Sequence, residues 1–193
     1  MYGPAMVATH SGPYTIGDYY ALPDDGQRYE LLDGSLIVSP WPAVRHQVAV
    51  SQLTDQLNLA CPADLAVLQV SVRIRDSVLI PDVCVVRRAA LPPAGLDVEP
   101  ADVELVVKIV SPTNARMDRV LKPTVYAEAG IPAFWRIELD AVGGPEIHAH
   151  EIAGAVYREV ARVPSGRRFV ASRPFEVAFD PAELTAPMDD PDG

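Results

Sequence analysis

The sequence predicts an α/β (or α+β) domain, in which a mixed β-sheet is flanked by helices and β-hairpins lie near both ends. Helical and strand patterns alternate through the middle of the chain, and two-residue turn signals separate short apolar runs towards each end. Of the 193 residues, 49% are hydrophobic and 22% are charged, which supports a buried core rather than a disordered chain. We expect one domain over residues 14–186, with tails at 1–13 and 187–193.

Local signals near the start of the chain predict a helix and then a hairpin. Thr15 precedes residues 16–22, and its hydroxyl suits a helix N-cap. Asp33-Gly34 separates two short apolar runs, and both residue types accept the positive φ of a hairpin turn. Residues 42–60 are predicted to form the longest helix of the first half, ending before Pro62. Its apolar residues recur at helical spacing: Val44, Val48, Leu53, Leu57 and Leu59.

Three strands are predicted next, from the spacing of apolar residues. Residues 64–76 alternate apolar and polar side chains, as a single half-buried strand does. Residues 78–86 are apolar but contain a proline, so this strand bends, begins late or lies at an edge. Residues 103–112 are apolar apart from Glu104 and Lys108, which suits a central strand covered on both faces.

A second helix is predicted over residues 117–129. Leu121, Val125 and Tyr126 are expected to face inward, and Gly130 suits the C-terminal end of the helix. Tyr126 is assigned to packing rather than to base stacking, because an aromatic residue in an alanine-rich helix usually belongs to a core.

The remaining segments are predicted to be one loop and three strands. Residues 87–102 hold three prolines and show no period, which is typical of a loop. Trp135 lies at a strand start and is also assigned to packing. The strand-like runs are residues 131–139, 146–152 and 155–163, with a turn at Gly143-Gly144.

Charge and composition exclude several classes of protein. A net charge of −10 disfavours a large non-specific nucleic-acid surface, although a small cleft of local positive charge remains compatible with it. No apolar run approaches the ~20 residues of a membrane span, and the N-terminus lacks a secretory pattern, so we expect a cytoplasmic protein without a membrane partner. Cys61 and Cys84 lie in apolar surroundings and are expected to be buried, reduced thiols, which excludes a disulfide framework or a zinc cluster.

Two charged residues stand out within apolar runs. Asp82 begins the run DVCVV, where a carboxylate is costly to bury unless it is paired, protonated or bound to a cation. The simpler interpretation is an exposed turn residue after Pro81. Lys108 lies at the centre of LVVKIVSP and must extend its ammonium to solvent, pair with a carboxylate or face a cavity.

The other candidates are less distinctive. Asp118 and Lys122 are four residues apart on the second helix, and the preferred interpretation is an ordinary surface pair worth about 0.3–0.5 kcal/mol. Glu30 fits a cross-strand partner, and His46 near the start of the first long helix fits a capping or surface group.

Taken together, the segments RYELLDGSLIVSPWPAVRHQ, IPDVCVV, ELVVKIVSP and DRVLKPTVYAEAGIPAFW resemble the Uma-two family of endonucleases, within the PD-(D/E)XK, restriction-endonuclease-like superfamily. The resemblance extends from about Tyr14 to Trp135. It implies a restriction-endonuclease-like mixed sheet, a divalent metal site (Mg²⁺ or Mn²⁺), and hydrolysis of DNA phosphodiester bonds. Many nucleases of this superfamily act as dimers, so a homodimer is left open.

The resemblance also implies roles for individual residues. Asp82 matches the main metal ligand, and Lys122 matches a lysine that orients or acidifies the attacking water. Glu30 and His46 match the N-terminal glutamate and the histidine at the start of the first helix. Carboxylate oxygens suit a hard divalent cation, which would stabilise charge on the phosphate and activate water. We expect Asp82, Lys108 and Lys122 to converge in one pocket, with Glu30 and His46 at its rim.

Lys108 departs from the family pattern, which has a glutamate at this position as the second metal ligand. An ammonium cannot bind a cation, and we expect it to pair with Asp82 instead. Glu104 cannot substitute, because it lies four residues earlier on the same strand, about 13 Å away at ~3.3 Å per residue. If the site does act with metal, Glu30 is the candidate for the missing ligand. The sequence thus leaves open a metal-dependent DNA endonuclease or a catalytically inactive nuclease-fold protein acting as a nucleic-acid-binding or protein-interaction module.

Overall fold

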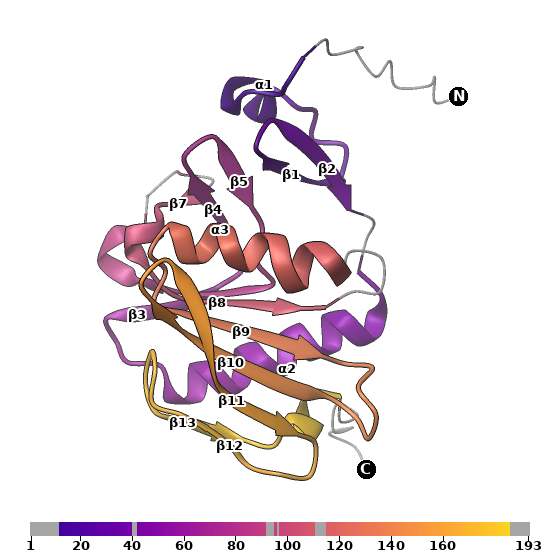
Figure 1. Ribbon diagram of the computed structural model, residues 1–193, viewed down its shortest axis with the longest axis vertical. Coiled ribbons are helices and arrows are strands. Elements are labelled where there is room, and N and C mark those ends of the chain that lie inside the picture. Colours follow the sequence, from indigo (N-terminus) through magenta and orange to yellow (C-terminus); the bar gives the residue numbers. More distant parts are fainter. Residues whose placement is uncertain (1–11, 40–41, 92–94, 96, 111–114, 186–193) are drawn as a thin grey trace, which may run out of the picture.

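The computed structural model describes residues 12–39, 42–91, 95, 97–110 and 115–185 (Figure 1). Most of the two predicted tails lies outside these residues. Two β-sheets and a small hairpin carry the fold, with strand orders β11-β10-β9-β8-β6-β3, β2-β1-β5-β4-β7 and β12-β13. The pairs β8–β9 and β4–β7 are parallel and the other pairs are antiparallel, so both larger sheets are mixed. The predicted mixed character is confirmed, but the strands divide between two sheets rather than forming one.

The six-stranded sheet consists of β3 (Leu65–Leu68), β6 (Val83–Arg87), β8 (Val103–Ile109), β9 (Ala133–Glu138), β10 (Glu146–Ala153) and β11 (Val156–Pro164). The five-stranded sheet consists of β1 (Arg28–Leu32), β2 (Ser35–Ser39), β4 (Ser71–Ile74), β5 (Ser77–Leu79) and β7 (Asp97–Val98), and the hairpin of β12 (Phe169–Ala171) and β13 (Val177–Phe179). The helical elements are α1 (Ile16–Tyr20), α2 (Val44–Ala60), the π-helical turn η4 (Met117–Leu121), α3 (Lys122–Glu128) and the 3₁₀ turns η1 (Arg88–Ala90), η2 (Pro100–Asp102) and η5 (Pro181–Thr185).

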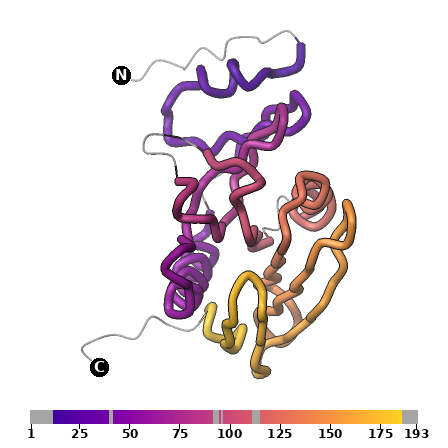
Figure 2. The backbone as a smooth tube through the Cα atoms, turned by 90° about the vertical axis from the view of Figure 1, so that its left-hand side faces the viewer, coloured from indigo at the N-terminus to yellow at the C-terminus, as the bar shows by residue number. Residues whose placement is uncertain are grey.

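Helices α2 and α3 cover opposite faces of the six-stranded sheet (Figure 2). In β8, Leu105, Val107 and Ile109 pack in the core that includes α2 and the β12–β13 hairpin, whereas Val106 packs in the core that includes Tyr126 of α3. This alternation follows from the two-residue period of a strand. The predicted central strand, covered on both faces, is confirmed for residues 103–109.

The local signals at the start of the chain are confirmed. Thr15 caps α1, because its side chain accepts from the Asp18 backbone N–H and the Asp18 carboxylate accepts from the Thr15 backbone N–H. The helix is shorter than predicted and ends at Tyr20. The β1–β2 hairpin turns at Asp33 and Gly34, with φ values of 47° and 77°.

Helix α2 occupies nearly the predicted range, but two of its expected core residues are exposed. Leu53 and Leu57 are fully buried, whereas Val44 is 76% exposed and Leu59 is 84% exposed. At about 100° per residue, Val44 lies roughly 180° around the helix from Leu53, so the two cannot face the same core. The buried stripe instead includes Ala49 and Val50.

The single strand predicted over residues 64–76 is wrong, because the chain leaves one sheet and enters the other within it. β3 pairs with β6 in the six-stranded sheet, and β4 pairs with β5 and β7 in the five-stranded sheet. Strand pairing is interrupted at residues 80–82, between β5 and β6, where Pro81 cannot donate to a ladder. Of the three alternatives predicted for residues 78–86, the structure therefore has the bend. The predicted loop over 87–102 also carries β7 and two 3₁₀ turns.

The second helix begins with the π-helical turn η4 and ends where Gly130 takes a φ of 82°. Leu121 is 42% exposed, against the prediction that it faces inward. A π turn holds more residues than an α turn. Leu121 therefore lies at a different angle around the helix from the one that a 3.6-residue period predicts. Tyr126 is fully buried, as expected.

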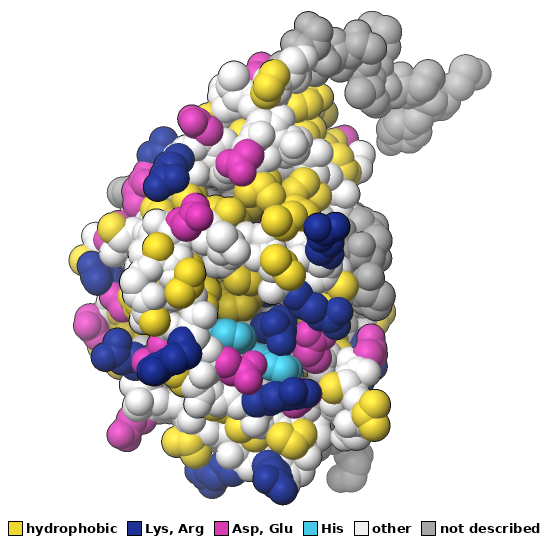
Figure 3. All heavy atoms as spheres, in the orientation of Figure 1, with side chains coloured by type: hydrophobic (Ala, Val, Ile, Leu, Met, Phe, Trp, Pro, Cys, Tyr) yellow, Lys and Arg dark blue, Asp and Glu magenta, His cyan; other side chains and the backbone are white. Residues whose placement is uncertain are grey.

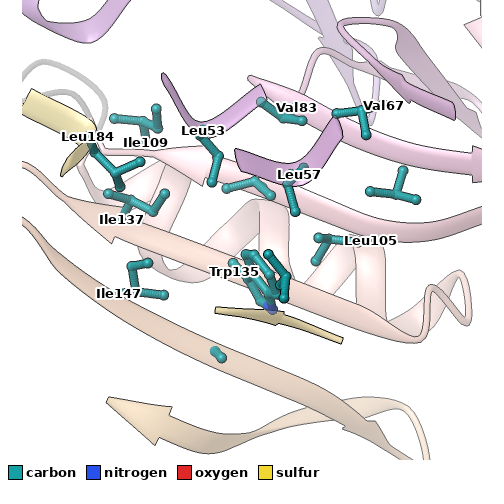
Figure 4. Packing of buried hydrophobic residues seen from close by; sticks show 14 of the residues in the cluster. Leu53, Leu57, Val67, Val83, Leu105, Ile109, Trp135, Ile137, Ile147 and Leu184 are labelled. Carbon is teal, nitrogen blue, oxygen red and sulfur yellow. The ribbon is translucent and has the colours of Figure 1, made fainter. Parts of the chain in front are cut away.

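The placement of Trp135 agrees with a role in packing. Its side chain is 2% exposed and meets the Phe169 ring edge-to-face, with ring centroids 4.9 Å apart. Figure 4 shows it beneath α2 among the aliphatic residues of the larger core. Cys84 is buried and Cys61 is partly exposed, and neither forms a disulfide. Among the described helices, none combines the length and apolar character of a membrane span.

Candidate active site

Five charged side chains are buried together where the two sheets meet α3. They are 2–6% exposed and come from separate elements: Glu30 from β1, Asp82 from the residue before β6, Lys108 from β8, Asp118 from η4 and Lys122 from the first residue of α3. Buried charges require partners, because an isolated ion loses its hydration without compensation. We call these five residues the charge cluster.

Asp82 is held by its backbone and by its side chain. Its N–H donates to the carbonyl of Val107 (3.0 Å), and its Oδ2 accepts from the N–H of Ile109 (2.7 Å). The Lys108 Nζ lies 3.0 Å from the same Oδ2, and the His46 Nε2 lies 3.6 Å from Oδ1. Since the preceding strand, β5, ends at Leu79, Asp82 meets β8 at the break between the two sheets.

Ammonium and carboxylate groups alternate through the rest of the charge cluster. Asp118 Oδ1 lies 3.9 Å from the Lys108 Nζ and 3.4 Å from the Lys122 Nζ, without hydrogen-bond geometry to either. Lys122 donates to Glu30 Oε2 (2.6 Å), and Glu30 Oε1 accepts from the N–H of Ile80 (2.8 Å). Each of the two lysines, which are the only lysines of the chain, therefore lies between two carboxylates.

These contacts shift the pKa values of the central pair in opposite directions. Burial alone would raise the pKa of Asp82, but the ammonium of Lys108, the His46 ring and the Ile109 N–H hold it well below its usual value. Burial alone would lower the pKa of Lys108, but the carboxylates of Asp82, Asp118 and Glu30 raise it above its usual value. Asp82 and Lys108 therefore form a charged pair across the neutral pH range.

The stability of the fold should decrease in acid because of Asp82. Its pKa is lower in the folded protein than the usual value near 3.9. Its ionised form therefore stabilises the fold fully above about pH 4, and this contribution is lost as the pH falls towards the folded-state pKa. Urea unfolding at a series of pH values should show the wild type losing roughly 2 kcal/mol more than Asp82→Asn between about pH 5 and pH 2. A difference between the two proteins that stays constant with pH would contradict this.

The geometry agrees only partly with the arrangement expected from the sequence. Asp82 and Lys108 are in direct contact, whereas Lys122 reaches them through Asp118. Glu30, expected at the rim, is 4% exposed and lies inside the cluster. His46 does lie at the edge, with a side chain that is 12% exposed.

Asp118 is the residue that sequence reasoning missed. The pair with Lys122 was expected on the surface, but both side chains are buried. The i, i+4 spacing was visible in the sequence, but it carries no information on burial. The π-helical turn that carries Asp118 had no signal in the sequence.

A pocket of about 310 Å³ opens beside Asp82 and His46. Its lining comes mainly from α2, including Ser51 and Asp55, and is completed by Arg28 of β1 and by Gln69 between β3 and β4. Guanidinium, hydroxyl and amide groups of this kind are common donors to phosphate oxygens.

The residues present do not fit the divalent cation that the family resemblance implies. Asp82 Oδ2 already accepts from Ile109 and faces the ammonium of Lys108. That ammonium has no lone pair and repels a cation. Among the described residues, no three His, Cys, Asp or Glu side chains are grouped so as to hold a metal ion.

Comparisons with known proteins identify the family. A crystal structure from Anabaena variabilis, described as that of "a putative nuclease belonging to DUF820", aligns with a TM-score of 0.69, covers 90% of this chain and 98% of that chain, and is 15% identical. At this identity the likeness shows the fold. No curated protein matches. The family model described as "Uma2: Putative restriction endonuclease" matches residues 16–185. The chain therefore belongs to the Uma2 family, the Uma-two family that the sequence motifs resemble.

Proposed function

We propose that this protein binds DNA at the pocket beside Asp82, and that Lys108 suppresses the metal-dependent hydrolysis of DNA that the family resemblance implies. The observation that carries the proposal is the 3.0 Å distance between the Lys108 Nζ and Asp82 Oδ2. A side-chain cation thus faces the carboxylate that matches the family's main metal ligand. It supplies one positive charge, but it cannot lower the pKa of a bound water as a divalent metal does.

The second lysine supports the same conclusion. A lysine that acts on an attacking water must direct its ammonium at that water. In this protein the Lys122 Nζ is 2.6 Å from Glu30 Oε2 and 3.4 Å from Asp118 Oδ1, and its side chain is 2% exposed. Its ammonium is therefore engaged inside the protein.

DNA is the proposed partner because of the family and because of the pocket. Arg28, Ser51 and Gln69 offer donors around one opening beside His46 and Asp82, whereas the Thr54 hydroxyl donates to the Val50 carbonyl and Asp55 adds a carboxylate. Contacts of this type position a phosphate backbone without reading its sequence. They need only a local surface, so they are compatible with a net charge of −10.

A second candidate function is the Mg²⁺- or Mn²⁺-dependent endonuclease itself. It is favoured by the burial of Asp82, Glu30 and Lys122, the residues that match the family pattern, in one cluster. This function requires the Lys108 ammonium to leave Asp82 when a cation enters.

Plasmid nicking distinguishes the two functions. We expect the wild type to leave supercoiled DNA intact to the same extent with Mg²⁺, with Mn²⁺ and with chelator, and to bind a labelled duplex in chelator. Asp82→Asn should leave the plasmid as intact as the wild type does, because there is no Asp82-dependent cleavage to lose. Asp64→Asn is the matched control, because Asp64 is exposed and its carbonyl bonds to Arg88 N–H at the far end of β6.

Two outcomes would contradict the proposal. Metal-dependent nicking that disappears in Asp82→Asn but persists in Asp64→Asn would establish the endonuclease. Failure to bind DNA, with or without metal, would exclude a DNA partner and favour a protein-interaction role.

A further inference from the structure

A row of basic side chains crosses the six-stranded sheet from the charge cluster. The strand registers place Arg136 of β9 opposite Lys108 of β8, His148 of β10 opposite Arg136, and Arg162 of β11 opposite His148. Side chains at directly paired positions point to the same face of a sheet. Four basic residues from four neighbouring strands therefore line up over about 14 Å, at ~4.8 Å per strand.

The outer part of this row lines a pocket of about 620 Å³. We call it the arginine pocket and define its basic groups as Arg119, Arg136, His148 and Arg162. Arg119 extends from η4, so the pocket lies between the helix and the sheet. Figure 3 shows histidine, basic and acidic side chains gathered on this face of the molecule.

The guanidinium groups of the pocket outnumber the carboxylates that hold them. Glu138 accepts two hydrogen bonds from Arg119 (2.8 and 2.7 Å) and also lies 3.0 Å from the Arg136 Nε. Glu146 accepts two from Arg162 (2.5 and 3.2 Å) and lies 3.6 Å from the His148 Nε2. Three guanidiniums thus share two carboxylates.

The neighbouring acids have other partners. Asp140, which also lines the pocket, pairs with Arg45 at 2.5 Å. Glu159 lies 2.8 Å from the His148 Nδ1 and 3.8 Å from the His150 Nε2. Among the described residues, four arginines and four carboxylates are thus gathered around the pocket, which is close to neutral although the chain as a whole carries a net charge of −10.

Arg136 is the most informative member of the pocket. Its side chain is only 18% exposed, and its buried Nε lacks hydrogen-bond geometry to any described group in spite of the 3.0 Å approach of Glu138. A buried donor without an acceptor is uncommon in folded proteins. Arg119 and Arg162 are about half exposed, at 48% and 61%, so the pocket presents a buried cation with two accessible ones around it.

We propose that the arginine pocket binds a backbone phosphate of the DNA strand that occupies the pocket beside Asp82. This inference rests on the proposed function. The planar guanidinium fork suits phosphate oxygens, and two arginines on opposite walls can hold one phosphate between them. The two pockets adjoin at the end of β8, because His46, which lines the pocket beside Asp82, approaches the Ile109 carbonyl (3.3 Å), and the next residue, Val110, lines the arginine pocket. A phosphate held in the arginine pocket would set the register of the strand relative to Asp82.

The test compares matched arginine substitutions in a DNA-binding titration. The anisotropy of a labelled duplex is measured in chelator at several salt concentrations for the wild type, Arg136→Gln and Arg162→Gln. Arg158→Gln is the control. Arg158 is exposed, belongs to the same strand as Arg162 (β11), and lies opposite Glu151 of β10 in the strand register. Positions 148 and 151 point to opposite faces of β10, so Arg158 lies on the face away from the pocket.

Arg136→Gln and Arg162→Gln should each bind DNA about tenfold more weakly, and each should reduce the slope of log K against log salt by about one. Arg158→Gln should bind within about twofold of the wild type. Thermal unfolding checks each fold, and Arg162→Gln keeps the test valid if Arg136→Gln does not fold, since Arg162 is 61% exposed.

Three outcomes would overturn the inference in distinguishable ways. If the wild type binds DNA and both pocket variants behave like Arg158→Gln, the inference fails while the proposed function stands. If the wild type binds no DNA, both the inference and the proposed function fail. If inorganic phosphate binds the wild type as tightly as the duplex does, and Arg162→Gln abolishes that binding, the pocket is a site for a free anion rather than for a strand.

Discussion

Replacing Lys108 with glutamate is expected to lower the free energy of unfolding of the metal-free protein by at least 3–5 kcal/mol, the rough cost of breaking a buried ion pair. The substitution removes the ammonium that lies 3.0 Å from Asp82 and 3.9 Å from Asp118. It also places a third carboxylate beside these two, and like charges in a buried site repel. Urea unfolding in chelator measures the loss.

The same substitution should make stability depend on Mg²⁺. A cation that binds only the folded state stabilises it by mass action, by about 2.7 kcal/mol at a concentration one hundred times its Kd. Unfolding and plasmid nicking are therefore measured with Mg²⁺ and with chelator. Lys108→Gln is the control, because it removes the ammonium without adding a carboxylate and should gain much less from Mg²⁺. Equal Mg²⁺ stabilisation of the wild type and Lys108→Glu would contradict the view that Lys108 takes the place of the cation.

Asp118 rather than Glu30 should complete the restored site. The sequence favoured Glu30 as the substitute ligand, but its two oxygens are bonded to Lys122 and to the N–H of Ile80. Asp118 Oδ1 faces the Lys108 Nζ without a hydrogen bond of its own. Adding Asp118→Asn to Lys108→Glu should therefore remove most of the Mg²⁺ stabilisation.

Lys122→Met is expected to cost about 3–5 kcal/mol of unfolding free energy. Its ammonium links β1 to the second helix through Glu30 and Asp118, and the methionine would leave two buried carboxylates facing each other. Lys122→Met combined with Glu30→Gln should be less destabilised than Lys122→Met alone, because one of those charges is also removed. A double-mutant cycle by urea unfolding gives the coupling between the two side chains.

The matched control is an exposed ion pair of the same protein. Arg87 and Glu104 approach to 2.7 Å, but Arg87 is 55% exposed, so Arg87→Met should cost no more than about 1 kcal/mol. If Lys122→Met costs as little as Arg87→Met, the charge cluster does not hold the two sheets and the helix together.

Elements with local signals were predictable from the sequence. The cap at Thr15, the turn at Asp33-Gly34 and the extent of α2 depend on residues that are neighbours in the chain. The face that a helix buries and the length of a strand do not depend on neighbouring residues alone. Leu121 and Val44 are exposed because the faces of their helices are chosen by what packs against them, and residues 64–76 divide between two sheets because their partners lie in different parts of the chain.

The sequence by itself determined the family and the mixed character of the sheet, and it placed Lys108 where the resemblance implies a metal-binding glutamate, because these follow from residue identity within short motifs. Only the tertiary structure decided that Asp118 and Glu30 are buried with the two lysines, and that Arg136, His148 and Arg162 continue the row from Lys108. The physical reason is the same for the buried charge cluster and for the row of basic residues. The energy of a charged group depends on its desolvation and on its nearest opposite charges, and both are set by segments that are far apart in the chain and adjacent only after folding.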